Sequence, residues 1–308
     1  MSITPTKKIW MDGTFVDWPD ATVHVLSHTL HYGTGAFEGI RAYKTPNGVA
    51  IFRLKDHMER LVRSCKILSI DVPFCVKDFC EAAKELVRVN ELNDGCYIRP
   101  IVYLGYGEMG VNPLGAPVNA AMAAWAWGAY LGEDASLNGA RMKISSWARH
   151  HPNSMPTASK TIGGYVNASL AKVEAVKAGY DEAIMLGPDG RVSEGTGENL
   201  FLVRDGKLVT PPPSEAGALR GITQASIVKI ANDLGIEVSF EALRRDDIYL
   251  ADEAFVTGTA VEVVPLSSVD DRLIGDGKPG PITKTIKTTY HQAVSGERPQ
   301  YEDWLTRV

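Results

Sequence analysis

The sequence predicts a protein of mixed α and β class (α/β, in an α+β arrangement) that is built from two domains. Its 308 residues, 44% of them hydrophobic and 22% charged, are typical of a soluble globular chain that is long enough to bury a substantial core. The first half alternates strands and helices, whereas the second half repeats a strand, a turn and a strand between helices. The change of rhythm between the halves indicates a domain boundary.

The first half is expected to run from strands to helices and back to strands. Its opening stretch alternates around an Asp-Gly turn and predicts an antiparallel hairpin. Two helices and two strands should follow, at 54–68, 76–92, 96–105 and 120–127, with Phe79, Ala83, Leu86 and Val87 on one face of the second helix. Because Gly and Asp break the pattern next, we expect a first domain at 1–127, a connecting loop at 128–136 and a second domain at 137–308.

The second half is expected to begin with hairpins and to end with a helix. Residues 182–195 and 199–211 each resemble a strand, a turn and a strand. A helix over 222–235 should stop at Gly235, and a strand should follow it. The positions that fall on one face are Val166, Leu170 and Val173 in a helix after residue 165, Ile227, Ile230, Ala231 and Leu234 in the helix over 222–235, and Ile282, Ile286 and Tyr290 in a last helix after Pro281.

Composition excludes several classes of function. A net charge of −5, with acids and bases interspersed, argues against a nucleic-acid-binding protein, which would carry a concentrated basic surface. The longest apolar run, near residues 120–131, is shorter than the roughly 20 residues that a membrane helix needs. The four cysteines form no C-x-x-C pair and no secretory leader precedes them, so we expect reduced thiols in a cytoplasmic protein.

Two weak patterns are interpreted as structural. "GYGEMG" at 105–110 matches a dinucleotide-binding fingerprint, but Pro113 and Pro117 stand where the phosphate-binding helix should run, which favours a mobile loop. His24 and His28 could be metal ligands on a helix, yet their surroundings look extended and no other ligand pattern supports a metal. We expect both imidazoles to form hydrogen bonds in a polar interior and no metal to be bound.

The helix start at Ile222 and Thr223 is a candidate anion site. Its free backbone N–H groups and the helix dipole attract negative charge, and the Thr223 hydroxyl adds a donor. The alternative is an ordinary capped helix. Both interpretations stay open on spacing alone.

Glu194 is expected at the end of a strand, before two glycines, Glu198 and Asn199. Two acids in a turn usually lie on a solvated surface. The functional alternative requires a cation as partner, and a protonated heteroaromatic nitrogen would be suitable.

Lys160 lies in a run of small residues, "PTASKTIGGY", that would let a planar group approach the backbone. Most lysines are solvated charges, and alone this one would be interpreted so. An anion site, a strand-end carboxylate and a lysine are, however, the set that a pyridoxal 5'-phosphate enzyme requires, because they hold its phosphate, its ring nitrogen and its aldehyde carbon.

The chain resembles the branched-chain amino acid aminotransferases of fold type IV along nearly its whole length. The residues that carry the resemblance are "HYGTGAFEGIR", "HMERL", "YIRP", "WGAYLG", "PTASKTIGGY", "SEGTGENLF", "LRGIT" and "GTAVEVVP". One departure is Gln224, where the family usually has a basic residue after the G-I-T turn.

The resemblance implies a two-domain fold, with a small N-terminal α/β domain, a larger C-terminal pseudo-barrel domain and pyridoxal 5'-phosphate in the cleft between them. It also implies a homodimer or a higher homo-oligomer. Lys160 matches the lysine that forms the Schiff base, and it is the expected catalytic residue. The other positions that match cofactor-binding residues are Arg60, Tyr165, Glu194, Ile222, Thr223 and Thr259.

The implied activity is transamination of branched-chain L-amino acids (Leu, Ile and Val) with 2-oxoglutarate, which gives branched-chain 2-oxo acids and L-glutamate. Positions that match the substrate pocket are Tyr32, Phe37, Gly39, Tyr97, Arg99, Trp127, Tyr130, Thr259 and Ala260. Alternatives within the fold are D-amino acid and (R)-amine transaminases and aminodeoxychorismate lyase. Alternatives from other classes are a nicotinamide-dependent dehydrogenase, which would rest on "GYGEMG", and a binding protein in which Lys160 is incidental.

Overall fold

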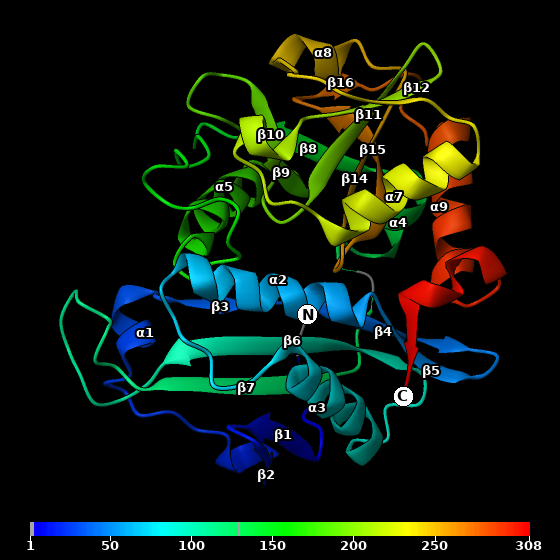
Figure 1. Cartoon of the computed structure of the whole chain (residues 1–308). Coiled ribbons are helices and arrows are strands. Elements are labelled where there is room, and N and C mark those ends of the chain that lie inside the picture. The colour runs from blue at the N-terminus through cyan, green and yellow to red at the C-terminus, as the bar shows by residue number, and fades with distance from the viewer. Residues whose placement is uncertain (1–2, 129) are drawn as a thin grey trace. The chain divides into compact units, whose positions relative to one another are not determined.

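The computed structural model describes residues 3–128 and 130–308, which divide into two compact units (Figure 1). Unit 1 contains the chain up to Trp127 together with Ser159–Gly164 and Gln292–Val308, and unit 2 contains Gly128–Ala158 and Tyr165–His291.

The units differ from the predicted sequence ranges in two places, because two distant segments hydrogen-bond to unit 1. The amide of Phe37 donates to the carbonyl of Lys160 (3.1 Å), and the amide of Ile162 donates to the carbonyl of Gly35 (2.9 Å). Near the C-terminus, Thr306 pairs with Ile51 in an antiparallel ladder. The predicted connecting loop at 128–136 also contains the start of a helix at Glu133.

Unit 1 is built on one antiparallel sheet, which has eight strands within the described residues, in the order β17-β5-β4-β6-β7-β1-β2 with β3 beside β6. Their bounds are β1 Lys8–Met11, β2 Thr14–Asp17, β3 Gly35–Phe37, β4 Ile40–Thr45, β5 Gly48–Phe52, β6 Gly95–Leu104, β7 Val118–Trp125 and β17 Leu305–Arg307. The hairpin predicted at the start of the chain is confirmed as β1 and β2, and the two strands predicted at the end of the first half are β6 and β7.

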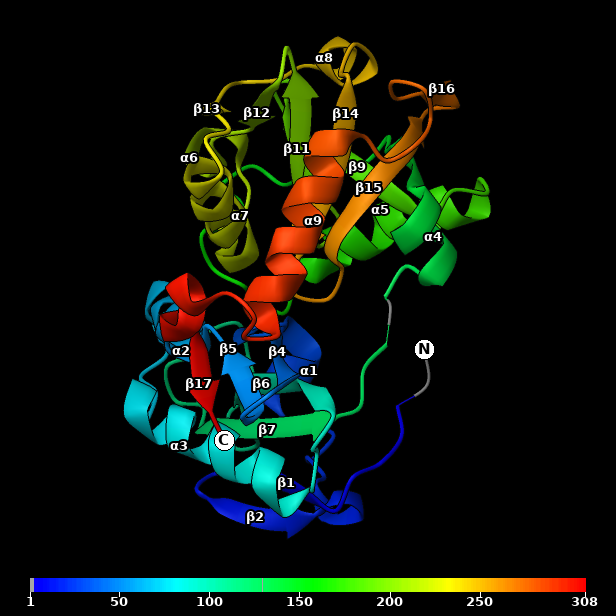
Figure 2. The same cartoon turned by 90° about the vertical axis from the view of Figure 1, so that its right-hand side faces the viewer.

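The helices of unit 1 cover the sheet with their apolar faces. They are α1 (His28–Tyr32), α2 (Leu54–Ile67) and α3 (Val76–Val89), with short 3-10 turns η1 (Trp18–Asp20) and η2 (Pro299–Trp304). The four positions predicted on one face of α3 are all buried in a core shared with α2 and the sheet. Figure 2 shows the ribbon of α3 beside β1 and β7. The Asp78 side chain accepts from the amide of Cys75 (2.8 Å) and stabilises the start of α3.

Unit 2 is built on a second, mixed sheet, which has nine strands within the described residues, in the order β10-β9-β8-β15-β14-β11-β12-β13 with β16 beside β15. Their bounds are β8 Ala140–Ile144, β9 Glu182–Leu186, β10 Val192–Gly195, β11 Asn199–Arg204, β12 Lys207–Thr210, β13 Val238–Phe240, β14 Glu253–Gly258, β15 Glu262–Val269 and β16 Arg272–Leu273. The two predicted hairpins are confirmed as β9–β10 and β11–β12.

Strand β15 joins two parts of this sheet. Its first residues pair with β14, from Glu262 opposite Gly258 to Pro265 opposite Phe255. From Leu266 onward it pairs with β8, with a register shift between Leu266 and Ser268, and Ser268 and Val269 also pair with β16. A strand that changes partners at a bulge lets one sheet curve around a common core, which is the arrangement expected of a pseudo-barrel.

The helices of unit 2 are α4 (Glu133–Asn138), α5 (Tyr165–Lys177), α6 (Pro213–Ala216), α7 (Ile222–Asp233), α8 (Arg245–Tyr249) and α9 (Pro281–Val294), whose residues up to His291 belong to this unit. The predicted face of α7 is buried except at Leu234, which is the C-cap and is exposed. In α9, Ile286 and Tyr290 are buried and Ile282 is half-buried.

In α5, the face that packs on the sheet is made of alanines, not of the larger apolar residues. Ala168, Ala171 and Ala175 are buried, and the latter two pack with Ala183 and Met185 of β9. The predicted apolar face of Val166, Leu170 and Val173 is exposed. Small side chains let the helix approach the strand closely, so apolar periodicity alone did not identify the buried face. None of the described helices is long and apolar enough to cross a membrane.

Candidate active site

Lys160 is held by the backbone of unit 1. Its amide donates to the Ser64 hydroxyl of α2 (3.1 Å), and its carbonyl accepts from Phe37, so the residue is fixed between a helix and a strand. The side chain is half-buried, and its Nζ lies 5.0 Å from the centre of the Phe37 ring. An amine over an aromatic face is partly desolvated and restrained in direction.

The small residues around Lys160 serve close packing within unit 1. A Cβ on Gly33, whose φ is 68°, would lie 2.8 Å from the Cα of Gly163. Ser159 donates to the carbonyl of Ser64 (3.3 Å), and Thr161 donates to Ser159 (2.8 Å). The glycines and hydroxyls of this stretch therefore fix the backbone that carries the lysine.

Arg60 is bound by a buried carboxylate that the sequence reasoning missed. Its Nε donates to Oε1 of Glu38 (2.6 Å) and its second guanidinium nitrogen donates to Oε2 (2.8 Å). His57 contacts the same Oε2 through Nδ1 (2.8 Å). Glu38 lies inside the quoted "FEGIR" stretch, but only its burial and the helical spacing of His57 and Arg60 reveal the cluster.

The charges of this cluster follow from its contacts. Burial would raise the pKa of Glu38, but the charge and hydrogen bonds of Arg60, with those of His57, hold that pKa well below its usual range. Burial lowers the pKa of His57, despite the opposing carboxylate. Because an ionised carboxylate only accepts, a neutral His57 must carry its proton on Nδ1. Arg60 is thus held by a bidentate pair inside the protein.

Arg99 and its aromatic neighbours form the second group of predicted residues in unit 1. The guanidinium carbon lies 4.8 Å from the centre of the Phe37 ring, and a guanidinium nitrogen donates to the Tyr97 hydroxyl (3.0 Å). The Nε of Arg99 is buried and has no hydrogen-bond partner among the described residues. Trp127 stacks on Tyr97 with ring centres 4.5 Å apart. A buried donor without a partner is costly, so this arginine is suited to an incoming anion.

Gly39 lies next to the Tyr97 side chain, whereas Tyr32 lies beside His28. A Cβ on Gly39, which lies between β3 and β4, would overlap the Tyr97 hydroxyl, so glycine leaves room for that hydroxyl in its observed position. Tyr32 ends α1 and is exposed, and its ring lies 4.6 Å from that of His28. The structure of unit 1 therefore brings together Phe37, Gly39, Tyr97, Arg99 and Trp127, but not Tyr32.

Glu194 lies on β10 of unit 2 and is buried, with 5% of its surface exposed. Its Oε1 lies 2.7 Å from a guanidinium nitrogen of Arg149. Its Oε2 accepts from the amide of Leu219 (3.2 Å) and from the side-chain amide of Asn199 (3.4 Å). The alternative of a solvated turn is wrong, because both this carboxyl group and that of Glu198 are in the interior.

The start of α7 fits the prediction of an anion site. Gly221 is the N-cap and has no side chain with which to accept from the first amides, and no side-chain cap is present. Thr223 is buried, with 2% of its surface exposed. Gln224 turns into the unit instead, where its side chain donates to the Thr210 hydroxyl (3.0 Å). The departure from a basic residue therefore serves packing at this position.

The remaining predicted residues of unit 2 lie in turns or at helix ends. Thr259 and Ala260 form the turn between β14 and β15 and are half-buried. Tyr165 is the first residue of α5 and is also half-buried. Tyr130 is exposed, with the Nζ of Lys172 5.8 Å from its ring centre.

A second pair of buried carboxyl groups lies beside the Glu194 strand. Glu182 accepts from the Thr196 hydroxyl (2.8 Å) and from Lys172 Nζ (2.7 Å). Glu198 accepts from the amide of Gly197 (3.0 Å). Burial, and then the charge of Glu182, raises the pKa of Glu198 to about 8. Glu198 is therefore protonated over most of the neutral pH range.

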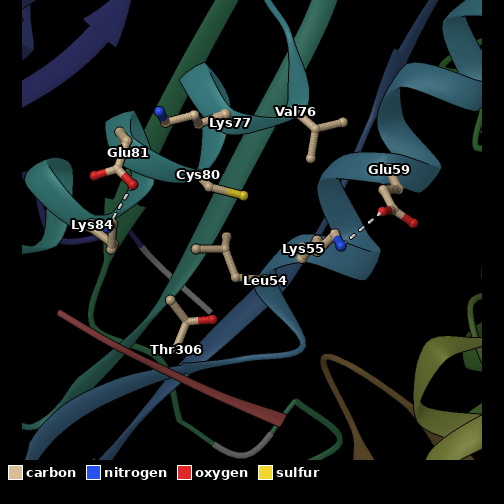
Figure 3. Close-up of a pocket in the computed structure, with 9 residues that line it drawn as sticks. All are labelled: Leu54, Lys55, Glu59, Val76, Lys77, Cys80, Glu81, Lys84 and Thr306. Carbon is tan, nitrogen blue, oxygen red and sulfur yellow. Dashed lines mark ion pairs between the residues drawn. The ribbon is translucent and has the colours of Figure 1, made fainter. Parts of the chain in front are cut away.

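Unit 1 also has a surface cavity that contains none of the predicted residues. It has a volume of about 450 Å³ and lies where α2, α3 and β17 meet, as the labelled side chains in Figure 3 show. Ion pairs of Lys84 with Glu81 (2.7 Å) and of Lys55 with Glu59 (3.8 Å) line it. Burial raises the pKa of its one thiol, Cys80, to about 11, which makes the sulfur a poor nucleophile. We assign no chemistry to this cavity.

The two weak patterns remain without a function. "GYGEMG" lies in the connection between the antiparallel strands β6 and β7, where the described residues 105–117 contain no helix. His28 is buried and its Nε2 contacts the carbonyl of Gly110 (2.8 Å), as predicted for a polar interior. The prediction was wrong for His24, which is exposed and whose Nδ1 accepts from the amide of Leu26 (3.1 Å) in a local turn. No cluster of potential metal ligands occurs in the part of the chain that the structure describes.

The residues match known proteins over almost the whole chain. The model of the class IV aminotransferases matches residues 35–269. The chain is 46% identical to the branched-chain-amino-acid aminotransferase of Pseudomonas aeruginosa over 300 residues, which are 97% of each chain. The chain belongs to the branched-chain amino acid aminotransferases of class IV.

Solved structures of this family have the same fold. A branched-chain amino acid aminotransferase from the source abbreviated T.th., with pyridoxamine 5'-phosphate, is 50% identical, has a TM-score of 0.95 and covers 99% of both chains. The same T.th. enzyme complexed with N-(5'-phosphopyridoxyl)-L-glutamate is 50% identical, with a TM-score of 0.94 over 98% of both chains. The predicted family and fold class are therefore confirmed for this aminotransferase.

The donor set of the aminotransferase fits a pyridoxal phosphate. Unit 1 supplies an amine at Lys160 and a guanidinium at Arg60. Unit 2 supplies the carboxylate of Glu194 and a helix start without a side-chain cap at Ile222. These groups match an aldehyde, a phosphate and a ring nitrogen in chemical character.

The buried Glu198 predicts a pH dependence of stability. An ordinary glutamate releases its proton near pH 4.5, whereas folded Glu198 keeps it to about pH 8. Between about pH 4.5 and about pH 8 the folded state therefore binds more protons than the unfolded state at this group. Because of this difference, the contribution of Glu198 makes the free energy of unfolding fall as the pH rises through that window. Since glutamine cannot ionise, Glu198→Gln should gain stability relative to wild type across that window.

Urea unfolding of both proteins at about pH 5, 7 and 9 measures this difference. Glu215→Gln, at an exposed position of unit 2, is the control and should show little pH-dependent change. A Glu198→Gln protein whose stability relative to wild type is constant with pH would contradict the assignment of a protonated Glu198.

Proposed function

We propose that the protein transfers amino groups between branched-chain L-amino acids (Leu, Ile and Val) and 2-oxoglutarate, with pyridoxal 5'-phosphate as its cofactor. The products are branched-chain 2-oxo acids and L-glutamate. The observation that carries the proposal is the similarity to aminotransferases of this name over 97% or more of the chain. Complexes of the T.th. enzyme with the pyridoxamine form of the cofactor and with a phosphopyridoxyl-glutamate support both the cofactor and glutamate.

In this proposal Lys160 is the catalytic residue and binds the cofactor covalently. The carboxylate of Glu194 binds the ring nitrogen, and the ion pair of Glu194 with Arg149 supports this role for a carboxylate. The phosphate is bound by Arg60, by the first turn of α7 and by the turn after β14. The complete set of cofactor-binding residues is Arg60, Lys160, Tyr165, Glu194, Ile222, Thr223 and Thr259.

The proton transfers are assigned to the amine of Lys160. The bound cofactor supplies an electron sink for the charge left when the substrate Cα loses its proton. Once the substrate amine has replaced it on the cofactor, Lys160 would be a free amine that takes up this proton and gives it back, since one positioned amine can act as base and then as acid. The fixed backbone of Lys160, between Ser64 and Phe37, holds Nζ in place for both transfers.

The substrate site must accept both an apolar side chain and the distal carboxylate of glutamate. Phe37, Tyr165 and Trp127 supply apolar walls, and Arg99 binds the distal carboxylate. Tyr32 and Tyr130, which are exposed in this structure, are assigned to the same carboxylate from the family resemblance alone. The unpartnered Nε of Arg99 supports this role, because a carboxylate would satisfy it. The α-carboxylate is bound by the backbone of Thr259 and Ala260 and by the Tyr97 hydroxyl, which Gly39 leaves room for.

Removal of the amine tests the core of the proposal. Wild-type protein purified with cofactor should be yellow. Lys160→Ala should lose the absorption band of the lysine-bound cofactor and at least about 10²- to 10⁴-fold of its activity, the usual contribution of a positioned acid–base group. Lys55→Ala, at an exposed position on α2, is the control and should keep both. Wild-type protein that stays colourless with added pyridoxal 5'-phosphate would exclude the proposed function.

Arg99→Ala tests the two-substrate site. Only 2-oxoglutarate brings a distal carboxylate, so loss of the guanidinium should weaken its binding by about 1.5 to 3 kcal/mol, while 4-methyl-2-oxopentanoate is affected much less. Steady-state kinetics with both 2-oxo acids measure how much the substitution changes kcat/KM for each of them. Equal losses would indicate a structural role for Arg99. A wild type that turns over D-alanine or (R)-1-phenylethylamine faster than L-leucine would instead favour another fold type IV activity.

We also propose that the protein forms a homodimer or a higher homo-oligomer. Unit 1 exposes apolar side chains in the segment before α1, in α1 itself and in the connection after β6, namely Val23, Val25, Leu26, Leu30, Tyr106, Met109, Val111 and Leu114. Val23 and Leu30 also line an apolar groove of about 260 Å³ beside β1, β6 and β7. Apolar surface of this kind is typical of a subunit interface. Sedimentation velocity should give at least a dimer mass, and a monomer at all concentrations would contradict the proposal.

A cytoplasmic location is proposed from the cysteines. All four are free thiols, and Cys65 and Cys96 are buried. Free thiols are usual where the environment is reducing.

A further inference from the structure

Arg149 is a largely buried arginine outside the set of site residues predicted from the sequence. It follows β8, and its amide donates to the carbonyl of Leu186 at the end of β9 (2.7 Å). Only 11% of its side chain is exposed. One guanidinium nitrogen lies 2.7 Å from Oε1 of Glu194, and Nε is buried without a hydrogen-bond partner among the described residues.

The surroundings of Glu194 make this contact different from its others. Asn199 and the amide of Leu219 donate to Oε2, and both are neutral donors. Arg149 contacts Oε1 and brings a full positive charge that no pH in the working range removes. Glu194 and Arg149 therefore form a nearly neutral buried pair, supported by neutral donors on the other oxygen.

A neutral pair has a consequence for any proton shared with Glu194. A positive charge in contact with the carboxylate lowers the proton affinity of the carboxylate. A base bound on the far side of the carboxylate is affected less, because Coulomb interactions weaken with distance. A base hydrogen-bonded to Glu194 would then keep the shared proton.

We propose that Arg149 is a positioning residue that keeps the proton of the hydrogen bond between Glu194 and the cofactor on the ring nitrogen of the cofactor. The inference rests on the proposed function, in which Glu194 binds that nitrogen. Arg149 acts through Glu194 and does so in two ways: its charge keeps the carboxylate ionised, and its fixed backbone orients Oε1.

A purely structural role for Arg149 is the competing explanation. An arginine beside a buried glutamate also compensates its charge, and its loss would lower stability whether or not a cofactor is bound. Thermal stability therefore does not separate the two explanations. The protonation state of the ring nitrogen does, because only the proposed role requires it to change.

The test uses the full chain loaded with pyridoxal 5'-phosphate that carries ¹⁵N at the ring nitrogen. The ¹⁵N chemical shift is measured for wild type, Arg149→Lys and Arg149→Gln, with the free cofactor at low and high pH as references. Wild type and Arg149→Lys, which keeps the positive charge, should lie near the protonated reference. Arg149→Gln should move toward the unprotonated reference, and its half-reaction with L-leucine should slow by about 10- to 100-fold, as expected for loss of a charge-assisted contact.

The outcomes separate this inference from the proposed function. An Arg149→Gln protein that binds the cofactor and keeps the protonated signal would overturn the role of Arg149 while leaving the proposed function intact. If the ring nitrogen is already unprotonated in the wild-type protein, the proposed role of Arg149 is overturned and no variant is needed to show it. Wild type that does not bind the labelled cofactor would exclude the proposed function and this inference with it. If Arg149→Gln fails to fold, Arg149→Met, which keeps the aliphatic stem, replaces it.

Discussion

Burial of ionised carboxylates is the constraint on which the candidate site depends. A charged group in a protein interior is tolerated only when donors and an opposite charge surround it. Each unit meets this requirement in the same way. Glu38 of unit 1 has Arg60 and His57, and Glu194 of unit 2 has Arg149, Asn199 and the amide of Leu219. The charges around Glu38 in unit 1 and around Glu194 in unit 2 are thus balanced by side chains of the same unit.

The same constraint has a different solution at Glu198. No arginine contacts this carboxyl group in the described structure, and the charge of Glu182 lies nearby. Protonation replaces a counter-ion there, whereas the neighbouring cation, Lys172, is bound to Glu182. Two glutamates four residues apart, Glu194 and Glu198, therefore have different surroundings: of the two, only Glu194 has an arginine in contact within the described structure.

Much of the fold could be predicted from the sequence, because local patterns decide it. Alternation around tight turns identified the hairpins, and apolar spacing identified α2, α3 and α7. The prediction was wrong for α5, where alanines pack against β9 and the larger apolar residues are exposed. It also missed Glu38 and Arg149, whose partners are distant in the sequence, so that only the folded backbone brings them together. The roles of Lys160 and Glu194 came from the family resemblance, since neither local stretch was decisive.

The edge strand β17 has a consequence for how the protein is made. It pairs with β5, but the whole sequence of unit 2 separates the two strands in the chain. On the ribosome, the edge of β5 must therefore wait, with its hydrogen-bonding groups unpaired, until unit 2 has been synthesised. Exposed strand edges are sites where nascent chains associate wrongly. The period of greatest risk for this polypeptide thus lies between the emergence of β5 and that of β17, and a chaperone that covers an open sheet edge would act within it.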